Sequence, residues 1–146
     1  MVLKYRFGQD HIKETLLTGR IGIPAHKAGT RSGPSGKIGF QNASSKKPLY
    51  YLLYDVDSQM VRGIGSSLGT AFYTDDVGTF QPDNRVPGEN WGHQLHGMTM
   101  INDTKAIPRE EFLEMGGKLG QGAAAYVTPK VWNRVKRHMI TIPKEG

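Results

Sequence analysis

The sequence predicts an α+β fold with a mainly antiparallel β-sheet, sandwich- or barrel-like, two or three short helices and long Gly/Pro-rich loops. Short apolar or alternating runs recur along the chain, as they do in β-strands. The 19 glycines and 8 prolines separate these runs, and helix-start signals stand at only a few places. A length of 146 residues suits one core, so we expect residues 1–146 to form a single domain.

The N-terminal segment is expected to form a strand followed by a short helix. In residues 2–7 every second residue is apolar, which is the pattern of a half-buried strand. Asp10 is suited to cap a helix, and Gly19 is placed to end it. A brief apolar run follows at residues 21–23. The apolar residues at helical spacing between Asp10 and Gly19 are Ile12, Leu16 and Leu17.

Residues 24–36 are expected to form a basic arm or loop rich in Gly, Pro and Ser. The segment has no hydrophobic periodicity and many residues that break helices and strands. Loops of this length are uncommon in compact domains unless they serve a function or are held by another chain. Two interpretations stay open, functional involvement and a flexible insertion.

The middle of the chain is expected to supply the core of the sheet. Residues 49–56 are apolar on both alternating faces, which favours a central strand covered on two sides. A turn at residues 57–59 would lead into a second strand at 60–64 and complete a hairpin. The elements expected beyond it are short strands at 71–73 and 77–80, a loop from 81 to 90 and extended structure from 91 to 101.

Two helices are expected in the C-terminal part. Pro108 can begin the first, with acidic residues in its first turn and Gly116 as its terminator. Thr128 and Pro129 form a cap and a first helical position, opening a helix through about His138. A strand at residues 140–142 would follow. In the second helix, Val131, Trp132, Val135 and Met139 form one face, and Lys130, Arg134, Lys136 and Arg137 cover much of the rest.

The composition excludes several classes of site. The chain has no cysteine, which rules out disulfides, thiolate catalysis and Cys-based metal sites. No apolar stretch approaches the roughly 18 residues of a membrane span, and the first residues are too polar for a secretory signal. We therefore expect no membrane partner and a cytoplasmic or virion location, and we predict no cofactor and no metal site.

Charge is segregated along the chain. Residues 1–47 carry nine Lys/Arg against two acids, a net +7; residues 48–115 carry four against ten, a net −6; and residues 116–146 carry six against one, a net +5. Such blocks can pair within one fold, pair between subunits, or present the basic parts to phosphate. The sequence does not separate these three interpretations.

Two acidic pairs are candidates for magnesium chemistry. Asp55 and Asp57 point to the same side of an extended chain, and Asp75 and Asp76 could approach them across the sheet. Acidic residues at hairpin ends are also ordinary turn formers. The structural interpretation of these residues is therefore favoured.

Histidines and glycine-rich segments offer weaker signals. His93 and His96 would point to opposite faces of a strand but could share an ion in an irregular turn. His26 and His138 could join Lys or Arg in metal-free RNA cleavage. For all four an ordinary structural or surface role is favoured. The glycine-rich segments, at residues 63–69 and 116–122, could contact phosphate, although a turn or bulge is favoured for the first and a plain linker is equally open for the second.

The basic residues could bind nucleic acid or another polyanion. Tyr50, Tyr51 or Trp132 would be available to stack on bases, although Trp132 is favoured as a core residue. The predicted polyanion-binding residues are Lys27, Arg31, Lys37, Lys130, Arg134 and Arg137.

The sequence favours two functions from different classes. The first is a structural or assembly protein, such as a component of a virion or another particle, that self-associates through its charged blocks and the 24–36 arm. The alternative is a small basic nucleic-acid-binding enzyme, similar to a nuclease, that uses His93, His96, Asp55 or Asp57. We predict assembly, hence a homo-oligomer or larger particle, because no convincing catalytic set is evident, and we leave nucleic acid as the other partner.

Overall fold

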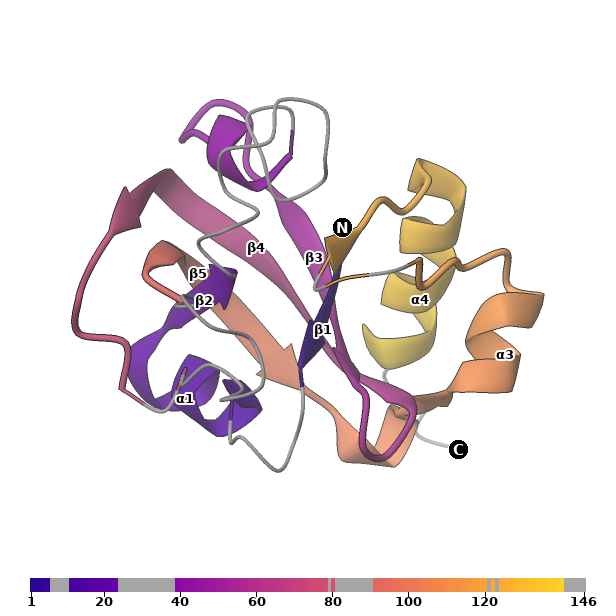
Figure 1. Ribbon diagram of the computed structural model, residues 1–146. Helices are drawn as coiled ribbons and strands as arrows, with labels where there is room; N and C mark the ends of the chain where they lie inside the picture. The colour runs from indigo at the N-terminus through magenta and orange to yellow at the C-terminus, as the bar shows by residue number, and fades with distance from the viewer. Residues whose placement is uncertain are drawn as a thin grey trace, which may run out of the picture.

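The computed structural model describes residues 1–5, 11–23, 39–78, 80, 91–120, 122 and 124–140. Within these ranges, seven strands form one curled, mostly antiparallel sheet, and three short α-helices pack beside it (Figure 1). The sheet curls into a half-barrel. The predicted α+β class, with a mainly antiparallel, barrel-like sheet, is therefore confirmed.

The strand order across the sheet is β2-β5-β4-β3-β1-β7, with β6 beside β4. β1 runs parallel to β3, whereas the other pairs are antiparallel. The elements are β1 (Val2–Tyr5), α1 (His11–Thr18), β2 (Arg20–Ile23), η2 (Phe40–Asn42), β3 (Tyr50–Asp55), β4 (Met60–Tyr73), β5 (His93–Ile101), η3 (Asp103–Lys105), β6 (Ile107–Pro108), α3 (Arg109–Glu114), β7 (Ala124–Ala125) and α4 (Pro129–Ile140), where η denotes a 3₁₀ turn.

The central strand β3 supplies both halves of the core, as its two-sided apolar pattern predicts. All its residues after Tyr50 are buried. Leu53 belongs to a cluster that includes Tyr51, Ile12 of α1 and residues of β2. Leu52 belongs to a second cluster, with Phe112 of α3 and the inward face of α4. Neighbouring residues of β3 thus enter opposite cores, because side chains alternate across a strand.

The hairpin of β3 and β4 is confirmed, but β4 is longer than the sequence predicts. It runs without a break through the glycines at 63–69, where the sequence indicated a turn or bulge between two strands. Its pairing with β5 shifts between Leu68 and Phe72, where Gly69 adopts a φ of 72°. The segment is therefore strand and bulge. The strand predicted at 77–80 is wrong at its described residues, because Phe80 N donates to Val77 O at 2.8 Å across a turn.

Helix α1 ends at Gly19, as predicted. Gly19 has a φ of 68°, and its N–H donates to Thr15 O at 2.9 Å. Helical spacing did not identify the buried face, however, because Leu17 is 83% exposed whereas Ile12 and Thr15 are buried. The proposed cap, Asp10, lies outside the described residues.

The two C-terminal helices are confirmed. Pro108 directly precedes α3, and Gly116, with a φ of 97°, follows it. At the start of α4, Thr128 Oγ1 accepts a hydrogen bond from Val131 N at 3.2 Å. The helix extends through Ile140, so the strand predicted from residue 140 is wrong at that residue. Val131, Val135 and Met139 of the predicted inward face of α4 are buried. Trp132, which the sequence also placed on this face, is only partly buried against the same cluster.

Several predicted segments cannot be compared with the structure. The 24–36 arm, residues 6 and 7 of the first strand, the 81–90 loop and residues 141 and 142 lie outside the described ranges. Among the described helices, none has both the length and the apolar character needed to cross a lipid bilayer.

The ring of Tyr51 packs in the core against glycine residues of two neighbouring strands. Its ring lies against Gly65 of β4 and Gly97 of β5, where any larger residue would collide with it. Its hydroxyl makes a 2.6 Å hydrogen bond with Thr99 Oγ1. Burial of the ring raises the pKa of Tyr51 to about 12.

We expect this raised pKa to make stability fall in alkali. Because the folded pKa of Tyr51 lies above the unfolded value of about 10, its contribution is complete below pH ~10 and is lost as pH rises through about 12. The free energy of unfolding, measured by urea titration across this range, should decline more steeply in the wild type than in Tyr51→Phe. If the free energies of unfolding of the two proteins fall equally with pH, the raised pKa does not belong to Tyr51.

Candidate functional site

One face of the sheet is left partly open beside α4. Across β4 and β5 the pairs Ser66–Met98 and Leu68–His96 lie on this face, and Tyr50 of β3 extends it through its pairing with Ser66. The face is apolar yet exposed, since Tyr50 is 49%, Leu68 51% and Met98 69% accessible. Contiguous exposed apolar surface of this kind marks interaction sites.

A groove runs between this face and α4. We call it the α4 groove and define it by Tyr50, Ser66, Met98, Met100, Trp132 and Lys136. Its volume is about 330 Å³, within the roughly 300–1,000 Å³ of typical small-ligand sites. α4 supplies one wall of the groove through residues four positions apart, which share one flank of a helix.

Aromatic and thioether groups give the groove flat, polarisable surfaces. The rings of Tyr50 and Trp132 lie 5.4 Å apart between centroids with an interplanar angle of 34°. Met98 and Met100 come from β5, and both are accessible. Such surfaces favour stacking of a planar ligand, because ring faces and sulfur both make strong dispersion contacts.

A cationic pocket adjoins the groove on α4. Asn133, Lys136, Arg137 and Ile140 line this pocket, which has a volume of about 410 Å³. Lys136 and Ile140 also line the α4 groove, so the two hollows share these residues as a common border. Lys136 therefore supplies a basic side chain to both hollows.

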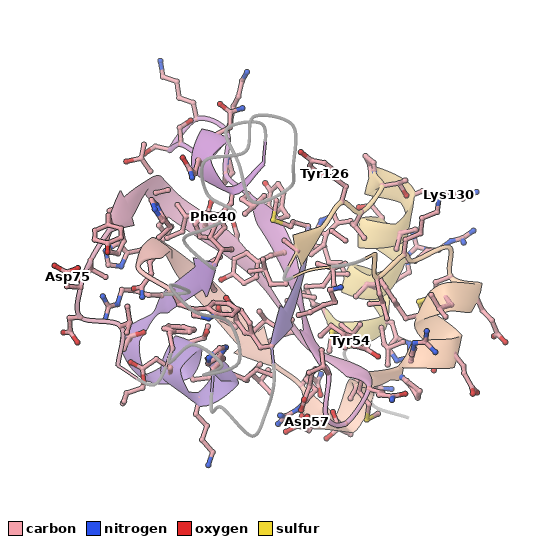
Figure 2. The ribbon with its side chains drawn as sticks, viewed as in Figure 1. Phe40, Tyr54, Asp57, Asp75, Tyr126 and Lys130 are labelled. Atoms are coloured by element: carbon pink, nitrogen blue, oxygen red, sulfur yellow. The ribbon has the colours of Figure 1, made fainter. Side chains whose placement is uncertain are left out.

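Of the six predicted polyanion-binding residues, the structure describes the three on α4. Lys130, Arg134 and Arg137 are exposed on α4, and Lys130 projects away from the sheet (Figure 2). Arg134 Nη1 donates to Met115 O at 3.0 Å, which links α4 to the end of α3. Lys27, Arg31 and Lys37 lie outside the described residues.

Sequence reasoning included Lys136 in the basic face of α4 but did not select it as a binding residue. It borders the groove because it follows Trp132 by four positions, on the flank of α4 that meets the open half of the sheet. The residues of α4 alone do not show which flank of the helix meets the sheet. Of the three predicted stacking residues, Tyr50 and Trp132 line the groove, whereas Tyr51 is buried in the core.

The acidic candidates do not converge. Asp55 is buried, its Oδ1 accepts from Asp57 N at 2.9 Å, and its Oδ2 pairs with Arg62 Nη1 at 3.3 Å. These contacts hold the β3–β4 turn. Asp57 is exposed at this turn, whereas Asp75 and Asp76 follow the other end of β4, and Figure 2 shows Asp57 and Asp75 far apart. No group of three or more acidic or histidine side chains suited to a metal occurs in the described part of the chain.

The two histidines of β5 face different surroundings. They stand three positions apart in a strand, which places them on opposite faces. His93 meets Tyr73 edge-on, with centroids 5.1 Å apart. His96 is exposed and stacks on Phe72, with a centroid distance of 4.9 Å and an interplanar angle of 28°. The structure therefore does not assemble them into one metal or catalytic site.

The structure contains a second aromatic cluster, which the sequence did not predict and which is buried away from solvent. Tyr5, His11, Phe80 and Trp91 meet with centroid distances of 4.6 to 6.0 Å. All four are buried, and Trp91, the most accessible, is only 6% exposed. These rings fill the core beside α1. Their separation along the sequence gave no local signal of the cluster.

No family model and no curated protein matches the sequence. Among solved structures, the fold is similar to the crystal structure of the YTH domain of the Zygosaccharomyces rouxii MRB1 protein in complex with N6-methyladenosine RNA. The TM-score is 0.57 with 10% sequence identity, over 98% of this chain and 88% of that chain. At this identity the likeness establishes a shared fold.

Proposed function

We propose that this protein binds single-stranded RNA in the α4 groove. One base lies against the wall formed by Tyr50 and Trp132, and the attached phosphate lies at Lys136. The observation that carries the proposal is the meeting of an aromatic wall, accessible methionines and a cation in one groove. The aromatic wall and the methionines suit the flat faces of a base, and the cation suits the anionic phosphate.

The groove suits an unpaired strand. The bases of a duplex are stacked on one another, whereas those of a single strand can be splayed out onto aromatic side chains. Stacking tolerates any base, because every base has a π-face. The accessible lining of the groove is mainly apolar, so we expect weak sequence preference at this position.

Two further facts support RNA as the partner. The chain carries a net charge of +6, and positive charge attracts the phosphate backbone regardless of sequence. The structural neighbour with the same fold was crystallised with RNA. Together they favour the nucleic-acid-binding hypothesis over the self-assembling structural or virion protein, and the described residues and the comparisons give no support to a homo-oligomer. We propose binding without assigning a reaction.

A matched pair of lysine variants tests the phosphate contact. We expect Lys136→Gln to weaken binding of a labelled oligouridylate by roughly tenfold and to lower the salt slope of log K by about 0.7, the value for one contact in a single strand. Fluorescence anisotropy across a salt series measures both quantities.

Lys130→Gln is the control, because it removes the same charge from the same helix away from the groove. It should leave the salt slope nearly unchanged. If both variants lose affinity and slope equally, binding depends on the overall charge of α4 and the groove assignment is wrong. If the wild type binds no RNA, the proposed function is wrong.

A further inference from the structure

The open face of the sheet continues past the α4 groove to a second exposed aromatic surface. Met98 and His96 are two positions apart on β5, so their side chains share a face and are about 7 Å apart along the strand. The His96 ring is exposed and stacks on Phe72. We call this pair the Phe72–His96 platform.

The bulge in β4 creates this platform. Leu68 pairs with His96, but the next paired residue on β4 is Phe72, opposite Gln94. In a regular antiparallel ladder Thr70 would take that place. The two additional residues in β4 therefore place Phe72, and not Thr70, opposite Gln94. From this position the Phe72 ring stacks on His96. Bulges that redirect a side chain are a recurrent feature beside functional sites.

A cation and an apolar residue flank the platform. Arg20 of β2 pairs with His96 on one side, and Leu68 of β4 pairs with it on the other. Cross-strand partners lie on the same face, with Cβ atoms about 4.5–5.5 Å apart. The arrangement is similar to that of the α4 groove, since both combine aromatic rings, an accessible apolar side chain and one basic side chain.

We propose that the Phe72–His96 platform is a second stacking subsite for the same RNA strand, one nucleotide or more beyond the α4 groove. This inference rests on the proposed function. The next base stacks on the exposed His96 ring, and Arg20 faces its phosphate. The strand then crosses the sheet from β3 toward β2, over Met98. His96 thereby acquires a binding role in place of the catalytic role considered from the sequence.

A length series of ligands separates the two subsites. We expect His96→Ala to leave binding of uridine monophosphate unchanged, because one nucleotide occupies only the α4 groove. For oligouridylates long enough to reach the platform, the same variant should lose about tenfold in affinity, within the range for one stacked base. His96→Phe should retain most of the affinity, since a phenyl ring also stacks.

His93→Ala is the matched control, because it removes the same side chain from the same strand on the opposite face. It should bind every oligonucleotide like the wild type. If His96→Ala binds all lengths like the wild type, while Lys136→Gln still weakens them, the second subsite is wrong and the proposed function stands. If no ligand binds the wild type, both are wrong.

Discussion

Replacing Tyr5 with phenylalanine is expected to destabilise the fold by about 2–4 kcal/mol, since it leaves two buried backbone groups without a partner. The Tyr5 hydroxyl donates to Gly22 O at 2.8 Å and accepts from Gly22 N at 2.9 Å. One side chain thus satisfies both backbone groups of a strand residue. Phenylalanine fills the same space, so the change isolates these two hydrogen bonds from packing.

The size of this effect follows from the position of β2 in the sheet. β2 is the end strand and pairs only with β5 among the described strands. Tyr5 stands on β1, several strands away across the curled sheet, and its hydroxyl reaches β2 across the open side of the half-barrel. Ile21 and Ile23, on either side of Gly22, are fully buried, so water would not readily replace the lost partner.

Urea unfolding of Tyr5→Phe and Tyr126→Phe measures this prediction. Tyr126 is 49% exposed, and a surface substitution of this kind is expected to change stability by less than about 0.5 kcal/mol. The same chemical change should therefore have a large effect at one site and a small one at the other. Equal free energies of unfolding for the two variants would show that the Tyr5 hydroxyl does not stabilise β2.

The fold was predictable from sequence where local patterns decide it. The two-sided apolar run at 49–56, the cap at Thr128 and the glycine at position 19 each gave the correct element, because backbone and burial requirements act within a few residues. Long-range contacts were not predictable. The parallel pairing of β1 with β3 and the bridge from Tyr5 to β2 depend on how the sheet curls.

The candidate site was predictable only in part, for the same reason. Sequence indicated a basic helix at α4 and offered Tyr50, Tyr51 and Trp132 for stacking, although it favoured Trp132 as a core residue. The structure places the rings of Tyr50 and Trp132 in one groove and buries Tyr51 in the core. The exposed methionines gave no signal, because an alternating strand such as β5 does not show which face another element covers. The ring pair of Phe72 and His96 depends on a bulge whose length the glycines did not reveal.

Placing a carboxylate in the α4 groove is expected to abolish most RNA binding without affecting the fold. Met98→Glu puts a negative charge in the groove that the anionic strand is proposed to occupy, and it removes an apolar contact surface. Like charges brought together at an interface cost several kcal/mol, which corresponds to a loss of about 100-fold or more in affinity. Met98 is 69% exposed, so the free energy of unfolding should change little.

Two variants separate the local effect from the change in net charge. Leu17→Glu also adds one negative charge at an exposed apolar residue, 83% accessible on α1, away from the groove. It should weaken binding several-fold at most, and less at high salt, because distant charges are screened. Met98→Leu keeps an apolar contact and should bind nearly like the wild type. If Met98→Glu and Leu17→Glu weaken RNA binding to the same extent, the strand does not lie in the α4 groove, and the binding surface must be sought elsewhere on the molecule.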